Sequence, residues 1–245
     1  NDFKPTHVIH SAAAYKDPDD WMEDTATNVL GSVHVAKAAL AVEVKRVVNF
    51  QTALCYGRPH QVPIPVTHPT APFTSYGISK TAGEAYLLQS GLPVVSLRLA
   101  NICGPRLAIG PIPTFYKRLK AGQNCFCSDT VRDFMVMSDF FSLMDKVLEA
   151  NAPEGVFNVS TGEGRSILDV FQAVAAYLGI STPNVPVVPA EEDDVRQVVL
   201  DPSATEAAFA WKAQVGFQET IENQLRWYDQ HGLNDIFSHL AQPRR

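Results

Sequence analysis

Four short runs of apolar, largely β-branched residues recur along the chain, and they constrain its fold more than any other feature. The runs are residues 6–10, 46–50, 94–98 and 156–159. Near-continuous apolarity over four to six residues is typical of a strand that is covered on both faces. Between the first three runs lie two segments with apolar residues at helical spacing, 21–44 and 79–89. Strands that alternate with helices predict right-handed crossovers and a parallel sheet.

The pattern changes after Asn101, where Gly-Pro pairs interrupt the chain. Further helices are predicted at residues 114–120, 138–150, 166–178 and 217–228. The whole pattern predicts an α/β fold, a doubly wound Rossmann-like parallel sheet with a smaller α/β lobe. We expect residues 1–105 to form the sheet domain, with 125–160 partly returning to it, and 106–245 to form mainly the smaller lobe.

Composition excludes several classes of protein. In 245 residues, 46% are hydrophobic and 19% charged, a balance that allows a sizeable buried core. No apolar run is long enough to span a membrane, and a net charge of −6 opposes nucleic-acid binding. Four scattered cysteines predict no disulfide framework, and seven histidines without ligand spacing predict no metal site. We expect a protein of the reducing cytoplasm.

The spacing Tyr-x-x-x-Lys occurs twice, at Tyr76 with Lys80 and at Tyr116 with Lys120. On a helix such a pair shares one face, and an ammonium beside a phenol lowers the phenol pKa from about 10. A general base near neutral pH then becomes possible. Tyr116 lies among three cations, which is typical of a solvated helix face. Tyr76 lies at the turn into a helix, so we expect it to meet Thr52 at the carboxyl edge of the sheet, where ligands bind.

A set of local motifs follows in a fixed order over most of the chain. These are residues 8–14 (VIHSAAA), 28–32 (NVLGS), 50–57 (FQTALCYG), the Tyr76–Lys80 pair, 97–106 (LRLANICGPR), 132–134 (RDF) and 157–162 (FNVSTG). In this set the chain resembles the extended short-chain dehydrogenases/reductases, specifically the NAD-dependent nucleotide-sugar epimerase/dehydratase group. The resemblance implies an NAD cofactor and 4-epimerase activity on a UDP-sugar, for cell-surface polysaccharide (O-antigen) biosynthesis. The sheet domain would then bind NAD, and the smaller lobe the substrate.

The resemblance also implies roles for individual residues. Tyr76 would be the base at the sugar 4-hydroxyl, with Lys80 supporting it and Thr52 bonding the same oxygen. The residues implied to bind the cofactor are Ala12, Ala13, Ala14, Asn28, Phe50, Tyr76, Lys80, Leu99 and Ile102. Those implied to bind the substrate are Thr52, Asn101, Arg132 and Arg196, with a surface ion pair to Asp133 as the alternative role for Arg132. Relatives commonly form homodimers through helices that would begin near Trp21 and Ser79 here.

The chain departs from the family pattern in two places. The Gly-rich phosphate loop is absent, and so is the acidic residue about 20 positions further on. The first strand therefore matches the family's fourth, and we expect about two βαβ units to be missing from the front. Residues 191–195 read EEDDV where many relatives have Arg-Pro-Gly-Asp-Val. Glu191 thus takes the place of an arginine that binds the substrate pyrophosphate, and Arg196 or Arg132 is expected to substitute.

The reaction type depends on the two residues after Thr52. Dehydratases of this family carry Asp-Glu there, whereas this chain has Ala53 and Leu54, which cannot move the protons that expel water. This difference favours a 4-epimerase. An NAD(P)-dependent reductase or dehydratase is the alternative. A non-catalytic NAD-binding sensor has the same fold but does not need the Thr52, Tyr76 and Lys80 set.

Overall fold

The sheet domain contains four parallel strands in the computed structural model, which describes residues 3–181, 184–191 and 194–233. The strands are β1 (His7–His10), β2 (Arg46–Thr52), β3 (Val94–Leu99) and β8 (Gly155–Val159), and they lie in the order β1-β2-β3-β8. All four coincide with the predicted apolar runs. The prediction of a parallel α/β sheet is therefore confirmed.

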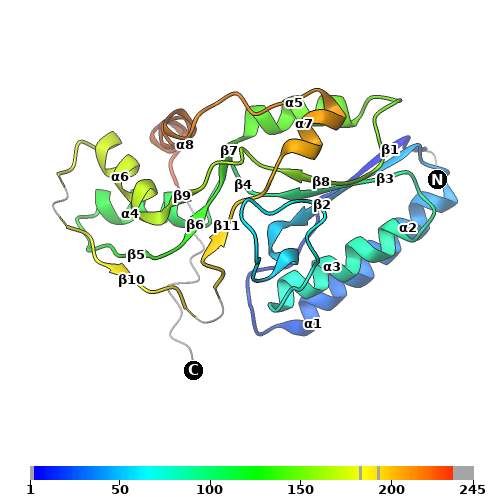
Figure 1. Cartoon of the computed structure of the whole chain (residues 1–245), viewed down its shortest axis with the longest axis horizontal. Coiled ribbons are helices and arrows are strands. Elements are labelled where there is room, and N and C mark those ends of the chain that lie inside the picture. The colour runs from blue at the N-terminus through cyan, green and yellow to red at the C-terminus, as the bar shows by residue number, and fades with distance from the viewer. Residues whose placement is uncertain (1–2, 182–183, 192–193, 234–245) are drawn as a thin grey trace.

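Helices cover both faces of this sheet (Figure 1). One face carries α1 (Trp21–Asp24), the π-helical turn η1 (Thr25–Leu30), α2 (Gly31–Ala41) and α3 (Ser75–Leu88). The other face carries α5 (Met137–Val147) and α7 (Ser203–Phe209). Side chains of successive strand residues point to opposite faces. Accordingly Val47 packs with α2 and α3, whereas Val48 packs with α5, and both are fully buried.

A smaller lobe follows, made of short strands and three helices around a separate core. Its helices are α4 (Pro111–Lys120), α6 (Ile167–Tyr177) and α8 (Phe217–His231). Its strand groups are β4 (Asn101–Cys103) with β7 (Phe134–Val136), β5 (Cys127–Ser128) with β10 (Val187–Val188), and β6 (Val131–Arg132) between β11 (Gln197–Val198) and β9 (Arg165–Ser166). Because β4 begins two residues after β3 ends, the carboxyl ends of the sheet adjoin this lobe.

Two helical elements differ most from the prediction. The helix predicted over 21–44 is divided by the π-helical turn η1, which carries Asn28 to the buried side. Helix α7 was not predicted, because its seven residues are too short to show a helical period. None of the helices in the described ranges is long and apolar enough to cross a membrane.

Candidate active site

Thr52 lies where β2 ends and a short 3₁₀ helix, η2 (Ala53–Tyr56), begins. Its extended backbone and its hydroxyl, which accepts a hydrogen bond from the Leu54 N–H at 3.2 Å, make it the N-cap of this turn. The side chain is half-buried. The hydroxyl is therefore presented at the carboxyl edge of the sheet rather than within it.

Tyr76 lies in the first turn of α3, which Thr74 caps through a 3.1 Å hydrogen bond from the Gly77 N–H. The Thr52 side chain lies close enough to the Tyr76 phenol for a hydrogen bond between them to lower the Tyr76 pKa. The expected meeting of Thr52 and Tyr76 is thus present in the structure. The segment that precedes α1 also reaches this point, since the Tyr15 ring lies edge-on to Tyr76 at 6.3 Å between centroids.

Lys80 lies one turn further along α3 and is 4% exposed. Burial lowers the pKa of Lys80 to about 8, while the nearby Glu84 carboxylate opposes that shift. Among the described residues no hydrogen bond is made by its ammonium group. His10, at the end of β1, is also close enough for the Lys80 charge to lower the His10 pKa, an effect that adds to the larger one of burial.

The electrostatics of Tyr76 correct one expectation. Lys80 was expected to bring the phenol pKa towards neutrality, yet burial raises the pKa of Tyr76 to about 12, with smaller contributions from Tyr15 and Asp24. The hydrogen bond with Thr52 opposes this rise. Desolvation disfavours the phenolate, and the ammonium does not offset it in the protein alone. Additional positive charge or a further hydrogen bond is needed before Tyr76 can act as a base.

Asn28 joins three segments around the site. Its side chain accepts a hydrogen bond from the Ala14 N–H and donates to the Ala14 carbonyl and to the Ser79 hydroxyl, each at 2.9 Å. The segment that holds Ala12, Ala13 and Ala14 is thereby tied to α3 beside Lys80. Asn28 is 1% exposed and sits in the π-helical turn, a feature frequent at functional sites.

The remaining residues expected to bind the cofactor are Phe50 and Leu99, at the ends of β2 and β3, and Ile102 on β4. Phe50, Leu99 and Ile102 are partly buried, and all three pack against the core beneath α5. Phe50 meets the Phe140 ring edge-on at 5.3 Å. Together with Ala12–14, Asn28 and Lys80 they surround the carboxyl ends of β1, β2 and β3, where open α/β sheets bind dinucleotides. This donor and apolar set fits a nicotinamide dinucleotide.

Apart from Thr52 at the edge of the sheet, the residues expected to bind the substrate lie in the smaller lobe. Asn101 is exposed and donates from Nδ2 to the Asp133 carbonyl at 2.9 Å. Arg132 is paired with Asp194 at 2.6 Å, and its Nη1 also donates to the Arg196 carbonyl at 3.4 Å. The Arg196 side chain extends to Asp129 in an exposed ion pair. In segment 191–195, residues 192 and 193 lie outside the described residues.

A hollow of about 560 Å³ lies between the loop after η2 and strands β6 and β11. Its lining residues include Arg58, Asp129, Asp194 and Arg196. Arg132 adjoins it through Asp194, whereas Thr52 and Tyr76 do not line it. The structure therefore groups Arg132 and Arg196 in one region and Thr52, Tyr76 and Lys80 in another.

Arg132 and Asp133 do not form the surface ion pair considered as an alternative. Asp133 is fully buried and accepts hydrogen bonds from the Thr161 N–H, the Thr161 hydroxyl and the Gly162 N–H. Its backbone also accepts from the Asn101 N–H at 3.1 Å. Asp133 is thus a structural link between β7 and the end of β8, while Arg132 pairs with Asp194.

The second Tyr-x-x-x-Lys pair forms a different kind of cluster. Lys120 donates to the Tyr116 hydroxyl at 3.0 Å, and Tyr116 and Tyr177 both donate to Asp229 on α8. These bonds join α4, α6 and α8 on the side of the smaller lobe. The cluster does not adjoin the sheet edge that carries Thr52.

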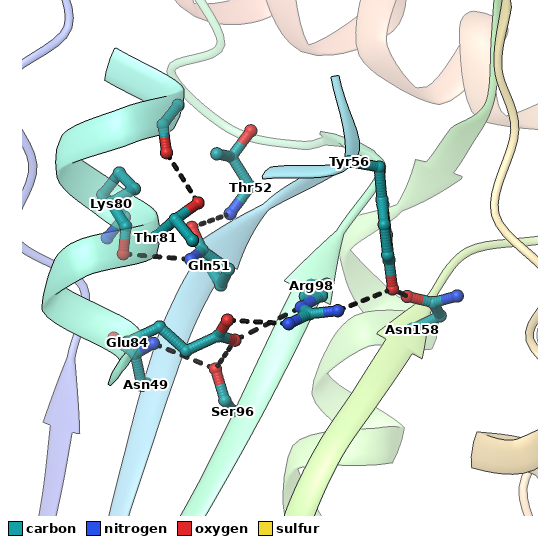
Figure 2. Close-up of polar contacts among 11 residues, drawn as sticks. Asn49, Gln51, Thr52, Tyr56, Lys80, Thr81, Glu84, Ser96, Arg98 and Asn158 are labelled. Carbon is teal, nitrogen blue, oxygen red and sulfur yellow. Dashed lines mark hydrogen bonds and ion pairs between the residues drawn. The ribbon is translucent and has the colours of Figure 1, made fainter. Parts of the chain in front are cut away.

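A buried polar network beside the site was not predicted (Figure 2). The Glu84 carboxylate is paired with Arg98 at 2.8 Å, and Arg98 also donates to the Tyr56 hydroxyl at 3.0 Å. Tyr56 in turn donates to Asn158 at 2.7 Å. One signal was present in the sequence, since Glu84 follows Lys80 by four residues and Arg98 interrupts an apolar run. No group of three metal-ligating side chains occurs among the described residues.

A parallel α/β sheet with Thr52, Tyr76 and Lys80 at its carboxyl edge defines a short-chain dehydrogenase/reductase type of protein. The NAD dependent epimerase/dehydratase family matches residues 1–160. The structure of the Bordetella bronchiseptica enzyme WbmG in complex with NAD and UDP is 70% identical, with a TM-score of 0.92, over 98% of this chain and 76% of that one. The chain belongs to the NAD dependent epimerase/dehydratase family.

Two more distant relatives agree with this assignment. The B. bronchiseptica enzyme WbmH in complex with NAD⁺ is 38% identical, with a TM-score of 0.88, over 95% of this chain and 78% of that one. The UDP-glucose 4-epimerase of Mycolicibacterium smegmatis is 30% identical over 247 residues, which span 93% of this chain and 77% of the relative. The similarity thus extends beyond the sheet domain into the smaller lobe.

Proposed function

We propose that this protein is an NAD-dependent 4-epimerase of a UDP-sugar. The observation that carries the proposal is the contact of Thr52 with Tyr76, one helical turn from the buried Lys80. Similarity to WbmG, with NAD and UDP bound, and to UDP-glucose 4-epimerases supports this cofactor and substrate class. The same resemblance supports a place in the assembly of a cell-surface polysaccharide, in the cytoplasm.

The reaction assigns one task to each of the three residues. Tyr76 takes the proton of the sugar 4-hydroxyl and later returns it, and Thr52 hydrogen-bonds the same oxygen and holds it in line. Lys80 supplies positive charge beside the phenol. Bound NAD would accept the C4 hydride and return it to the other face, so no net oxidation occurs. Ala12–14, Asn28, Phe50, Leu99 and Ile102 would hold that cofactor.

The smaller lobe would hold the nucleotide. The guanidinium forks of Arg132 and Arg196 suit the anionic oxygens of a pyrophosphate. Both are paired with aspartates in the protein alone, Arg132 with Asp194 and Arg196 with Asp129. Substrate binding would therefore exchange one of these carboxylates for a phosphate oxygen.

The residues around Thr52 favour epimerisation over elimination. Ala53 and Leu54 form the turn after Thr52, and neither carries a proton. The carboxylates that act on Tyr76 and Lys80 are those of Asp24 and Glu84. Asp24 is held by the Ser75 hydroxyl at 2.6 Å and Glu84 by Arg98, so both are buried structural partners rather than free acids.

Product analysis tests the proposal directly. Full-length protein with NAD and a series of UDP-sugars is followed by proton NMR. We expect one substrate to yield a second anomeric signal, that of its C4 epimer, without loss of water. The ratio of the two epimers should become constant when the reaction reaches equilibrium. A methyl doublet, from a 4-keto-6-deoxy sugar, would instead show the dehydratase reaction. A failure of every UDP-sugar to react would contradict the proposal.

The same proposal includes a homodimer formed through α3 and the helical segment that begins at Trp21, which comprises α1, η1 and α2. Figure 1 shows α2 and α3 side by side on one face of the sheet. This side of the molecule exposes large apolar side chains, at Trp21 (69%), Met22 (79%), Leu30 (51%), Ile78 (51%) and Tyr86 (56%). An apolar surface of this kind on adjacent helices is typical of an interface.

A further inference from the structure

Polar side chains occupy an unusual place beneath α3. Asn49 and Gln51 on β2, and Ser96 and Arg98 on β3, all lie on the sheet face that α3 covers, and each is at most 7% exposed. Towards the amino end of the same strands, this face is apolar and packs against Leu87. The buried polar groups therefore lie under the part of α3 that carries Lys80 and Glu84. Each such group needs a partner to offset its desolvation.

Gln51 connects the two elements that carry the candidate active site, the end of β2 and helix α3 (Figure 2). Its Nε2 donates to the main-chain carbonyl of Lys80 at 3.0 Å, and its Oε1 accepts from the main-chain N–H of Thr52 at 2.7 Å. The orientation of the amide is determined by these partners, because a carbonyl requires a donor and an N–H requires an acceptor. One side chain, 2% exposed, thus joins the end of β2 to α3.

A second set of hydrogen bonds joins α3 to the sheet at Glu84. The Glu84 carboxylate accepts hydrogen bonds from the Ser96 hydroxyl at 2.6 Å and from the Arg98 Nη2 at 2.8 Å. These bonds tie α3 to β3 one turn beyond Lys80. Arg98 also reaches Tyr56, which ends the turn that begins at Thr52. Both the helix and the turn are therefore anchored, and Gln51 links the end of β2 to the helix through hydrogen bonds.

We propose that Gln51 is a positioning residue that holds the Thr52 hydroxyl in register with the Tyr76 phenol. Because Tyr76 precedes Lys80 by one turn of the same helix, a bond to the Lys80 carbonyl also sets the position of Tyr76 relative to Thr52. The inference rests on the proposed function, in which both side chains contact the sugar 4-oxygen. Misplacement of reacting groups by about 1 Å costs on the order of 100-fold in rate.

Two variants of β2 test the proposal against a purely structural role. Gln51→Met and Asn49→Leu each remove a buried amide from the same face of the same strand. Within the described part of the chain, the Asn49 side chain is hydrogen-bonded to the Ser96 hydroxyl alone, at 3.0 Å, and not to Thr52, Tyr76 or Lys80. We expect Gln51→Met to lower kcat by roughly 10- to 100-fold with KM changed less than about twofold, and Asn49→Leu to keep kcat within about threefold. Equal losses of kcat in both variants, or none in Gln51→Met, would overturn the proposal.

A second measurement does not depend on activity. The Thr52 amide proton is bonded to Gln51, so its hydrogen exchange, measured by NMR, is expected to be at least about tenfold faster in Gln51→Met than in the wild type or Asn49→Leu. An unchanged rate of exchange at the Thr52 amide would overturn the positioning role of Gln51. If the Thr52 amide exchanges faster in Gln51→Met but the wild type turns over no UDP-sugar, the positioning role of Gln51 would be supported and the proposed function refuted. If Gln51→Met does not fold, Gln51→Asn, too short to reach both partners, is expected to give the same two results.

Discussion

At the scale of single residues, burial acts on Tyr76 and Lys80 in opposite directions. Burial raises the pKa of Tyr76 to about 12 and lowers that of Lys80 to about 8. In both cases the neutral form is favoured, which is the expected effect of desolvation. Under the proposed function, the positive charge that favours the Tyr76 phenolate would then come from the bound cofactor.

The lowered pKa of Lys80 makes the free energy of unfolding depend on pH. Below pH 8 the ammonium is protonated in both states, and its burial destabilises the folded protein. Between pH 8 and 10.5 the unfolded state retains a proton that the folded state has lost, so the free energy of unfolding rises with pH. Relative to Lys80→Met, the wild type should gain roughly 1–2 kcal/mol between pH 7.5 and 9.5 in urea unfolding. His10, Tyr76 and Glu84 are the neighbouring titratable groups and are present in both proteins.

Lys120→Met provides the control for this prediction. Lys120 is exposed, and its hydrogen bonds with Tyr116 and Asp229 raise its pKa rather than lowering it. Relative to Lys120→Met, the free energy of unfolding of the wild type should therefore not rise between pH 7.5 and 9.5. A difference between wild type and Lys80→Met that is independent of pH would contradict the lowered pKa of Lys80.

The choice between the two Tyr-x-x-x-Lys pairs shows what sequence could predict at this scale. Tyr76 was favoured by its position at a helix start after a strand that ends in Thr52, and the structure places these two side chains in contact. The bonds of Gln51 to Lys80 and of Arg98 to Glu84 and Tyr56 could not be predicted. Their partners lie up to 42 positions apart, and nothing in the local pattern indicates which strand face α3 covers.

At the scale of elements, strands were easier to predict than the detail of helices. The four apolar runs coincide with β1, β2, β3 and β8, because strands covered on both faces have a distinctive pattern. The π-helical turn η1 was not predictable, because one extra residue in a turn hardly alters helical periodicity. That turn nevertheless places Asn28 between Ala14 and Ser79.

The close approach of α3 to η1 gives an element-scale prediction. A Cβ at Gly83 would lie 2.4 Å from the Asn28 carbonyl oxygen and 2.7 Å from the Ser32 hydroxyl oxygen. Gly83→Ala should therefore lower the free energy of unfolding by about 1–3 kcal/mol, despite the better helix propensity of alanine. Gly31→Ala is the matched control, since its nearest contact lies at 3.8 Å, and it should be neutral or stabilising by up to about 1 kcal/mol. A stabilising Gly83→Ala, measured by urea unfolding, would contradict this packing.

At the scale of the whole molecule, the sheet and the smaller lobe meet at the carboxyl ends of the strands. The sequence pattern predicted a smaller α/β lobe but not where it meets the sheet. The short strands of the lobe were not predictable, because two-residue strands carry no periodic signal. The pairing of Arg132 with Asp194 was also missed. It joins segments 62 positions apart.

The proposed dimer is tested by light scattering. The wild type should be a dimer, and Tyr86→Glu, which places a charge in the proposed interface on α3, should shift it to monomer at micromolar concentration. Phe141→Glu is the matched control, because Phe141 is 59% exposed on α5, on the opposite face of the sheet. A monomeric wild type, or equal dissociation by both variants, would contradict the interface.

The central claim, that Tyr76 is the acid–base residue of a 4-epimerase, is tested most directly by comparing Tyr76→Phe with Tyr116→Phe. Each variant removes one hydroxyl from a Tyr-x-x-x-Lys pair, and turnover of the substrate identified by NMR is measured for both. We expect Tyr76→Phe to lower kcat by at least about 100-fold with substrate binding retained, and Tyr116→Phe to keep kcat within about threefold. Near-normal turnover in Tyr76→Phe, or its loss in Tyr116→Phe alone, would contradict the account.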